Sequence, residues 1–332
     1  MAKKHTVMVI AYDFDGTLAP GNMQEHQFLP DIGVTPQDFW TEVGRVSRRE
    51  QADEVLVYMK LMLRKAAAAG VPVRREDFVK RGRAMKLFAG VPEWFDRIDA
   101  YGRERGVRIE HYLISSGNAE IVAGTGIASK FREVYASKFM FDHNGIAEWP
   151  GLAVNYTTKT QYLFRINKGA LDLTDREGVN KLVDKRDRPV PFENMVFIGD
   201  GVTDIPAFRL VKEQGGLSIA VFRPRTRGAQ GKAGMYLTDS RVHCTVPAIY
   251  TEGRALDRLI KANIDLVAAR ASLLALMGRN PSDAAVRKPR RASIERAPPK
   301  RAAPEATAAA GRRSANRSSR SRVPAREPAP GG

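Results

Sequence analysis

Two aspartates separated by one residue, Asp13 and Asp15, stand directly after an apolar run at residues 6–11. An apolar, β-branched run that leads into two carboxylates and a glycine is typical of a buried strand opening into a loop. In open α/β sheets, ligands lie beyond the carboxyl ends of the strands, so both carboxylates should face a crevice. A carboxylate oriented by a metal can act as a nucleophile, because covalent catalysis divides one difficult displacement into two easier ones. The plainer interpretation is a polar turn at a strand end.

A second acidic segment, residues 199–204, follows a continuous apolar run and contributes Asp200 and Asp204. Asp200 could hold a hard cation together with a carboxylate oxygen of Asp13 and the main-chain carbonyl of Asp15. Asp204 would orient water on that cation or bind it directly. Mg²⁺ prefers sites made of a few carboxylates and completed by water and substrate phosphate. The predicted metal site therefore comprises all four aspartates.

The segments Asp13-Phe14-Asp15-Gly16-Thr17 and Gly199-Asp200-Gly201-Val202-Thr203-Asp204 resemble two motifs of the haloacid dehalogenase (HAD) superfamily, in its phosphoserine-phosphatase-like branch. The resemblance implies that Asp13 attacks phosphorus and becomes an aspartyl phosphate. It implies that Asp15 protonates the leaving group and then activates water, and that Mg²⁺ is the cofactor. The phosphate-handling branches keep the second aspartate, so the resemblance favours phosphoryl chemistry over dehalogenation.

Four converging carboxylates need positive charge and hydrogen-bond donors nearby, because their mutual repulsion would otherwise raise their pKa values. The metal would supply part of that charge. The HAD resemblance adds a serine or threonine after an apolar strand, and Ser115 occupies such a position, with Ser116 as the neighbouring alternative. A hydroxyl at a junction of strand and helix suits the binding of phosphate oxygens, although a helix-capping serine would have the same sequence signature.

The HAD resemblance also implies a phosphate-binding lysine, and here the sequence departs from the family pattern, which falls near Glu177. We favour Lys168, because it follows an apolar stretch at residues 162–164 that reads as a strand, and because a glycine comes next. Lys181 lies inside a predicted helix, where most lysines are solvated, and is the second choice. Lys159 is the third.

The elements that must position these groups form an α/β pattern after residue 107, in which apolar strand-like runs alternate with helical ones. This pattern predicts a Rossmann-like, mostly parallel sheet with helices on both faces. Residues 20–106 read as helical, and the HAD resemblance implies a type 1 cap, a helical lid inserted after the first strand. We therefore expect a catalytic core at residues 1–19 and 107–278 and a cap at residues 20–106.

Three local signals make specific structural predictions. Thr35 followed by Pro36 predicts a helix start, with threonine at the N-cap and proline at the first helical position. Asn144-Gly145, within residues 139–149, predicts a hairpin with a type I′ turn. Apolar residues at helical spacing predict a last helix at about residues 254–276.

The chain has 332 residues and a formal charge of +17, which is unevenly distributed. Residues 279–332 hold 14 Lys or Arg against 4 Asp or Glu and are rich in Ala, Pro, Arg and Ser. Such a segment cannot bury enough apolar surface to offset its ordering entropy, so we expect a disordered tail. Its basic runs could contact nucleic acid weakly, but without aromatic residues we favour a solvated tail.

The single cysteine, Cys244, excludes an intrachain disulfide and fits a reducing cytoplasm. No apolar run approaches a membrane span, and we do not expect a signal peptide at the N-terminus. The favoured function is hydrolysis of a small phosphorylated metabolite. A phosphomutase on the same site is one alternative. The other is a non-catalytic scaffold whose basic tail binds nucleic acid.

Overall fold

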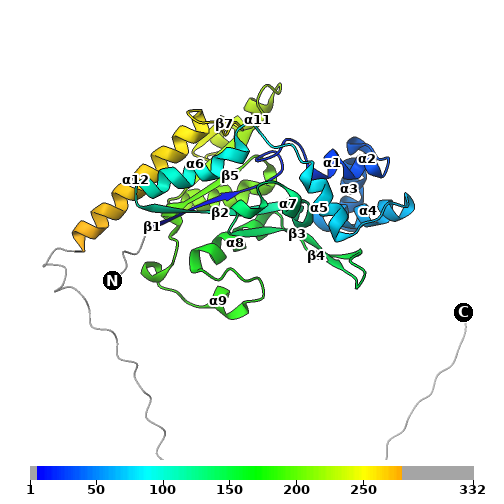
Figure 1. The fold of residues 1–332 in the computed structure, drawn as a ribbon, viewed down its shortest axis with the longest axis horizontal. Helices are drawn as coiled ribbons and strands as arrows, with labels where there is room; N and C mark the ends of the chain where they lie inside the picture. Colours follow the sequence, from blue (N-terminus) through cyan, green and yellow to red (C-terminus); the bar gives the residue numbers. More distant parts are fainter. Residues whose placement is uncertain (1–5, 279–332) are drawn as a thin grey trace, which may run out of the picture. The chain divides into compact units, whose positions relative to one another are not determined.

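The computed structural model describes residues 6–278, and the predicted disordered tail lies outside them. These residues form a seven-stranded sheet in the order β4-β3-β2-β1-β5-β6-β7 (Figure 1). Neighbouring strands are parallel except for β3 and β4, which are antiparallel. The strands are β1 (Thr6–Tyr12), β2 (Val107–Asn118), β3 (Glu133–Phe141), β4 (Ala147–Leu152), β5 (Met195–Gly199), β6 (Leu217–Phe222) and β7 (Cys244–Pro247).

Both faces of the sheet are covered, which explains why β1 is a continuous apolar run. Met8, Ile10 and Tyr12 belong to the hydrophobic core on one face, and Val9 and Ala11 to the core on the other. The helices α6 and α12 pack on the first face, and α8 packs on the second (Figure 1). The helix α10 contacts α8 and β5 and contributes to the core of the second face. The helices of this part are α6 (Val91–Glu104), α7 (Ala119–Gly124), α8 (Tyr156–Lys168), α9 (Arg176–Asn180), α10 (Ile205–Glu213), α11 (Ala229–Thr238) and α12 (Ala255–Met277). The expected α/β sheet and the expected last helix are confirmed.

Five helices between β1 and α6 gather beside the carboxyl end of the sheet (Figure 1). They are α1 (Met23–His26), α2 (Phe28–Asp31), α3 (Pro36–Glu50), α4 (Glu54–Ala68) and α5 (Arg75–Arg83). The predicted start of α3 is confirmed, because the Thr35 hydroxyl accepts the Asp38 N–H at 3.1 Å. The helix α4 begins in the same way at Asp53, whose carboxylate accepts the N–H groups of its first turn.

The inserted helices are joined to the sheet by close backbone packing between α5 and α7. An ideal Cβ at Gly82 would lie 1.9 Å from the Ile121 carbonyl oxygen, and one at Gly124 would lie 1.9 Å from the Val79 carbonyl oxygen. Glycine is needed at both positions because the two helix backbones touch. The following helix, α6, packs against β2 and α12.

Two local predictions are wrong. The hairpin of β3 and β4 exists, but within its turn Gly145 has positive φ (74°) and Asn144 does not, whereas a type I′ turn needs both. The Asp142 carboxylate accepts the N–H groups of Asn144 and Ile146, which favours a longer loop closed by the glycine. Residues 162–164 are part of α8 and not of a strand.

None of the helices among residues 6–278 is long and apolar enough to cross a membrane.

Candidate active site

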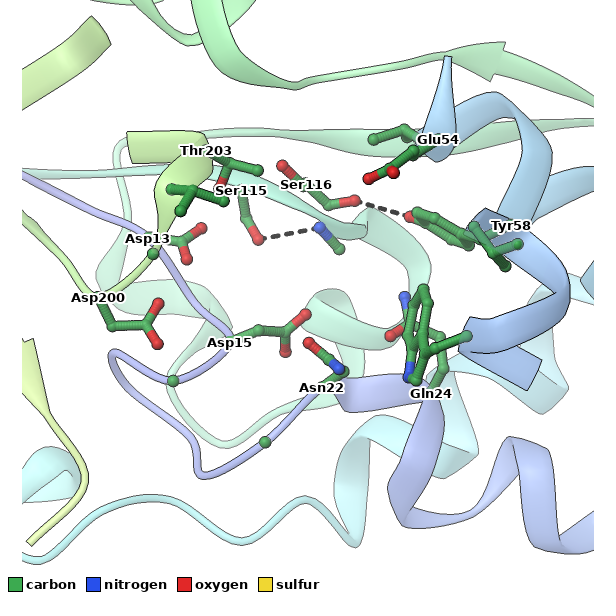
Figure 2. Close-up of a pocket in the computed structure, with 18 of the residues that line it drawn as sticks. Asp13, Asp15, Asn22, Gln24, Glu54, Tyr58, Ser115, Ser116, Asp200 and Thr203 are labelled. Atoms are coloured by element: carbon green, nitrogen blue, oxygen red, sulfur yellow. Dashed lines mark hydrogen bonds between the residues drawn. The ribbon is translucent and has the colours of Figure 1, made fainter. Parts of the chain in front are cut away.

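The site lies where the strand order of the sheet reverses. From β1 the chain continues to β2, β3 and β4 on one side of β1. After α8 it returns to form β5 on the other side of β1. Ligands bind at such switch points, beyond the carboxyl ends of the strands. Asp13 follows β1 and donates its N–H to the Ile198 carbonyl at 2.9 Å, and Asp200 follows β5. The two acidic segments, which are far apart in sequence, therefore lie side by side (Figure 2).

Gly16 allows the two acidic loops to approach each other. Its φ of 74° lies in the left-handed region, which favours glycine. An ideal Cβ at this position would lie 2.0 Å from Asp200 Oδ2. A side chain at residue 16 would therefore strain the turn and displace the Asp200 carboxylate.

Three carboxylates converge at the strand ends. Asp13, Asp200 and Asp204 each offer one oxygen, and these oxygens lie within 4.8 Å of one another. Asp204 is fully buried, and its Oδ2 accepts the N–H groups of Asp200 and Gly201, both at 3.0 Å. Asp204 therefore holds the loop that carries Asp200, while Asp13 and Asp200 face the cleft.

Lys159, on α8, supplies the positive charge inside this cluster. Its Nζ donates to Asp13 Oδ1 at 2.9 Å and to Asp204 Oδ1 at 2.6 Å, and its side chain is fully buried. Burial alone would lower the pKa of Lys159, but the two carboxylates outweigh burial and raise it, so the ammonium stays charged. Burial also raises the pKa of Asp13 to about 6, against the opposing effect of Lys159.

The structure does not bring Lys168 to the carboxylates. Lys168 lies in the last turn of α8, and its Nζ donates to the carbonyls of Val179 and Lys181 at 2.7 and 3.1 Å. Lys181 is exposed and contributes its carbonyl to that contact. The lysine that meets the acidic groups is Lys159, the last choice from the sequence.

A helical interpretation of residues 156–168 could have found Lys159. Lys159, Tyr162, Leu163 and Ile166 follow helical spacing, and all four are buried. The helix begins at Asn155, whose N–H donates to the Thr158 hydroxyl in a capping box. Residues 162–164 suggested a strand because aromatic side chains such as Tyr162 and Phe164 are enriched in strands, a preference that tertiary packing can override.

Asp15 lies in the loop after β1, two residues beyond Asp13. It lines the cleft and is half-buried. Its Oδ1 accepts the Met23 N–H at 2.9 Å, at the start of the first inserted helix. Burial and the nearby charge of Asp13 raise the pKa of Asp15 well above its usual value. A carboxyl group with a raised pKa is suited to donate a proton at neutral pH.

The two predicted serines lie at the end of β2 and line the same cleft. The Ser115 Oγ accepts the Gly117 N–H at 3.1 Å, so its own O–H is free to donate to a ligand (Figure 2). The Ser116 Oγ is buried and has no hydrogen-bond partner within residues 6–278, and the Ser116 carbonyl accepts the Tyr58 hydroxyl from α4 at 2.7 Å. The Ser115 side chain is therefore oriented by a hydrogen bond within β2, whereas the Ser116 main chain is hydrogen-bonded to α4.

The model of the haloacid dehalogenase-like hydrolase family matches residues 10–209, more than half of the chain. The chain belongs to this family. An uncharacterized protein of Borreliella burgdorferi is 27% identical over 237 residues, which are 64% of this chain and 80% of that protein. A HAD family hydrolase from Salmonella enterica serovar Typhi shares the fold, with a TM-score of 0.50 and 15% identity over 76% of this chain and 69% of the other. An apo phosphoserine phosphatase has a TM-score of 0.49 and 17% identity, over 77% and 98% of the two chains.

The carboxylates of this HAD hydrolase fit a divalent cation. Among the described residues, the Asp200 carboxylate accepts no hydrogen bond and has no cation within ion-pair distance. Burial, followed by repulsion from Asp13 and Asp204, raises the pKa of Asp200 well above its usual value. A cation between Asp13 and Asp200 would remove this penalty, and oxygen ligands of this kind suit Mg²⁺.

The cleft of this HAD hydrolase has a volume of about 590 Å³ and two dissimilar walls. The strand ends supply the acidic groups and the serines described above. The opposite wall is formed by residues of the inserted segment, which are Gly21, Asn22, Gln24, Trp40, Val43, Gly44, Glu54, Val55, Tyr58 and Phe88. In Figure 2, Gln24, Glu54 and Tyr58 of this wall lie on the other side of the cleft from Asp13 and Asp200.

Proposed function

We propose that this protein is a Mg²⁺-dependent phosphatase that hydrolyses a small phosphate monoester through an aspartyl-phosphate intermediate on Asp13. The observation that carries the proposal is the Asp13 carboxylate, which contacts the buried Lys159 ammonium and opens onto the cleft beside Asp15 and Asp200. Such a carboxylate can attack a phosphorus atom that enters the cleft.

In the first proposed step, an Asp13 oxygen forms a bond to phosphorus while the bond from phosphorus to the leaving oxygen breaks. Asp15 gives its proton to that leaving oxygen. In the second step, water attacks phosphorus, Asp15 takes a proton from the water, and the bond to Asp13 breaks with release of inorganic phosphate. The raised pKa of Asp15 supports its role as the proton donor.

We propose that Asp13, Asp200 and the main-chain carbonyl of Asp15 hold the metal, with Asp204 orienting their loop. Mg²⁺ bound there would supply positive charge that stabilises the transferring phosphoryl group. Asp204 stays in the predicted set of metal residues, but its hydrogen bonds to Lys159 and to two main-chain N–H groups favour a positioning role.

We propose Ser115 and Lys159 as the phosphate-binding residues, with Ser116 as a neighbouring donor. Lys159 takes the place that the sequence had assigned to Lys168, because Lys159 contacts the proposed nucleophile. The Ser115 O–H can donate to a phosphate oxygen, and the ammonium can stabilise charge that develops on the phosphoryl group.

We propose that residues 20–106 act as a type 1 cap over a core formed by residues 1–19 and 107–278. The lid itself would consist of α1 to α5, since α6 packs on the sheet. Its wall would exclude bulk water from the first step and contact the leaving group. Gln24 supports this role, because it is buried in the cleft wall and its Oε1 has no hydrogen-bond partner in the described part of the chain.

The test is release of inorganic phosphate from 4-nitrophenyl phosphate and from a panel of metabolite monoesters, with and without Mg²⁺. We expect Mg²⁺-dependent turnover that falls by roughly 10³-fold or more in Asp13→Asn. Asp96→Asn is the matched control, because Asp96 is exposed and pairs with Lys130 far from the cleft. Phosphoryl transfer to a second position without phosphate release would instead indicate a phosphomutase.

A protein that neither releases phosphate nor binds Mg²⁺ and beryllofluoride, a mimic of the aspartyl phosphate, would contradict the proposed chemistry. The scaffold alternative, in which the basic tail binds nucleic acid, would then be tested by deleting residues 279–332. That tail lies outside the described residues.

A further inference from the structure

A group of basic residues lies in the loop after β6 and in the first turn of α11, into which the loop leads, and two of them line the cleft. Between Glu213 and Asp239 the chain has no acidic residue. This stretch carries four exposed basic side chains, which are Arg223, Arg225, Arg227 and Lys232. Because β6 is a neighbour of β5 in a parallel sheet, its carboxyl end lies at the same edge as the acidic cluster. The basic loop therefore lies beside the proposed reaction centre.

Two of the four basic residues, Arg223 and Lys232, line the cleft. Among residues 6–278, neither forms an ion pair or a side-chain hydrogen bond, although Lys232 is near enough to Asp200 to lower the pKa of that carboxyl. Arg64 and Lys65 on α4, in contrast, both pair with Glu42. Arg223 and Lys232 thus offer unpaired positive charge to a molecule in the cleft.

The proposed binding of the reacting phosphate does not use the positive charges of Arg223 and Lys232. In the proposed function, that phosphate meets the metal, Ser115 and Lys159 at the strand ends. Arg223 also lines a second hollow, together with Gly21, Glu25 and Lys86. The two basic residues are therefore placed to contact a part of the substrate that extends from the reacting phosphate.

The charges on the inserted wall favour one direction for the part of the substrate that extends from the reacting phosphate. Its contribution to the cleft is apolar or uncharged except for Glu54, which is exposed and acidic. A second negative group on the substrate would be repelled by Glu54 and attracted by the basic loop. The carbon skeleton between the two groups would lie against Trp40 and Val43.

We propose that the substrate is a phosphate monoester whose leaving group carries a second anionic group, a phosphate or a carboxylate, held by Arg223 and Lys232. This inference rests on the proposed phosphatase function and adds the class of substrate to it. Contacts with a remote group of this kind contribute to kcat/KM because they position the reacting phosphate.

The test uses three esters with the same three-carbon skeleton, 3-hydroxypropyl phosphate, 2-carboxyethyl phosphate and propane-1,3-diyl bisphosphate, with 4-nitrophenyl phosphate as a general substrate. In the wild type with Mg²⁺, we expect kcat/KM for one or both esters with a second anion to exceed that of the hydroxypropyl ester by about tenfold or more. The two anionic esters distinguish a phosphate from a carboxylate as the recognised group. The preference should weaken as salt concentration rises.

The double variant Arg223→Gln/Lys232→Gln should lose this preference, and Arg223→Lys with Lys232→Arg should restore most of it. Arg227→Gln is the matched control, because Arg227 belongs to the same loop but does not line the cleft. Equal kcat/KM for the three esters in the wild type would overturn the inference while leaving the phosphatase proposal intact. An equal fall for all three in the double variant would also overturn it, by assigning both residues to the reacting phosphate. Absence of turnover of every ester, 4-nitrophenyl phosphate included, would overturn both proposals.

Discussion

The two walls of the cleft differ in how their side chains are held. On the sheet side, Lys159 and Asp204 are fully buried, and each makes hydrogen bonds to fixed partners at the ends of strands and helices. On the inserted side, Trp40, Val43 and Val55 present apolar surface, and Gln24 keeps an unpartnered polar atom. A rigid, charged wall suits the chemical step, whereas an apolar wall with few polar groups suits selection of the leaving group.

The inserted wall is nonetheless anchored to the sheet at its far end. The helices α5 and α7 meet at Gly82 and Gly124, where no side chain would fit. The strand β4 also packs against α4, and Arg75 donates its N–H to the Gly145 carbonyl in the hairpin turn. The difference between the walls therefore concerns the side chains that face the cleft more than the attachment of the backbone.

The strongest test of the rigid wall is Lys159→Met. We expect kcat/KM to fall by roughly 10²–10³-fold, because the variant loses the cation beside the proposed nucleophile. Folding stability should fall by about 3–5 kcal/mol, because the buried Asp13 and Asp204 carboxylates lose their counter-charge. Steady-state kinetics and urea unfolding measure the two effects.

Lys168→Met is the matched control for that variant, since Lys168 lies on the same helix and contacts loop carbonyls instead of carboxylates. It should retain near wild-type kcat/KM. If Lys168→Met lost activity and Lys159→Met kept it, the assignment of the phosphate-binding lysine would return to the sequence-based choice.

A smaller effect is expected from Gly16→Ala, which changes the contact between the two acidic loops. The new methyl group would press on the Asp200 carboxylate, and we expect kcat/KM to fall by about 10²-fold. Gly33→Ala is the control, because Gly33 also has positive φ (66°) but open space at its Cβ position. Both variants should lose about 1 kcal/mol of stability from backbone strain, so equal kinetic effects would contradict the proposed role of Gly16.

The smallest effect should come from Tyr58→Phe, which removes the hydrogen bond between the two walls. Loss of the bond to the Ser116 carbonyl should lower stability by about 1 kcal/mol and kcat/KM by about fivefold. Tyr101→Phe is the comparison, because the Tyr101 hydroxyl donates to Asp265 on the surface far from the cleft. An unchanged kcat/KM in Tyr58→Phe would mean that the walls act independently.

The acidic half of the site could be predicted from the sequence because it depends on strand ends. Asp13, Asp15, Asp200 and Asp204 each follow an apolar run, and parallel strands bring their carboxyl ends to one edge of the sheet. Ser115 came from the HAD resemblance, with Ser116 as the alternative, and its role in binding phosphate stays a prediction. The Thr35 helix start was predictable as well, because capping depends on neighbours in sequence.

The placement of the basic residues could not be predicted in the same way. Lys159 reaches Asp13 from a helix 146 residues later in the chain. Arg223 lines the cleft from the loop beyond β6, and Lys232 lines it from the following helix, α11. A charged side chain on a helix is solvated unless the packing of that helix buries it, and packing depends on the whole sheet. The division of the chain into a core and a cap at residues 20–106 stays a prediction.

By itself, the sequence determined the α/β class, the HAD resemblance and the four aspartates, because strand patterns and short motifs are encoded by neighbouring residues. The tertiary structure alone decided which lysine enters the acidic cluster, how closely Gly16 approaches Asp200 and which basic residues remain unpaired at the cleft. These features depend on distances between segments that are far apart in the chain, and such distances are set only when the sheet and its helices pack together.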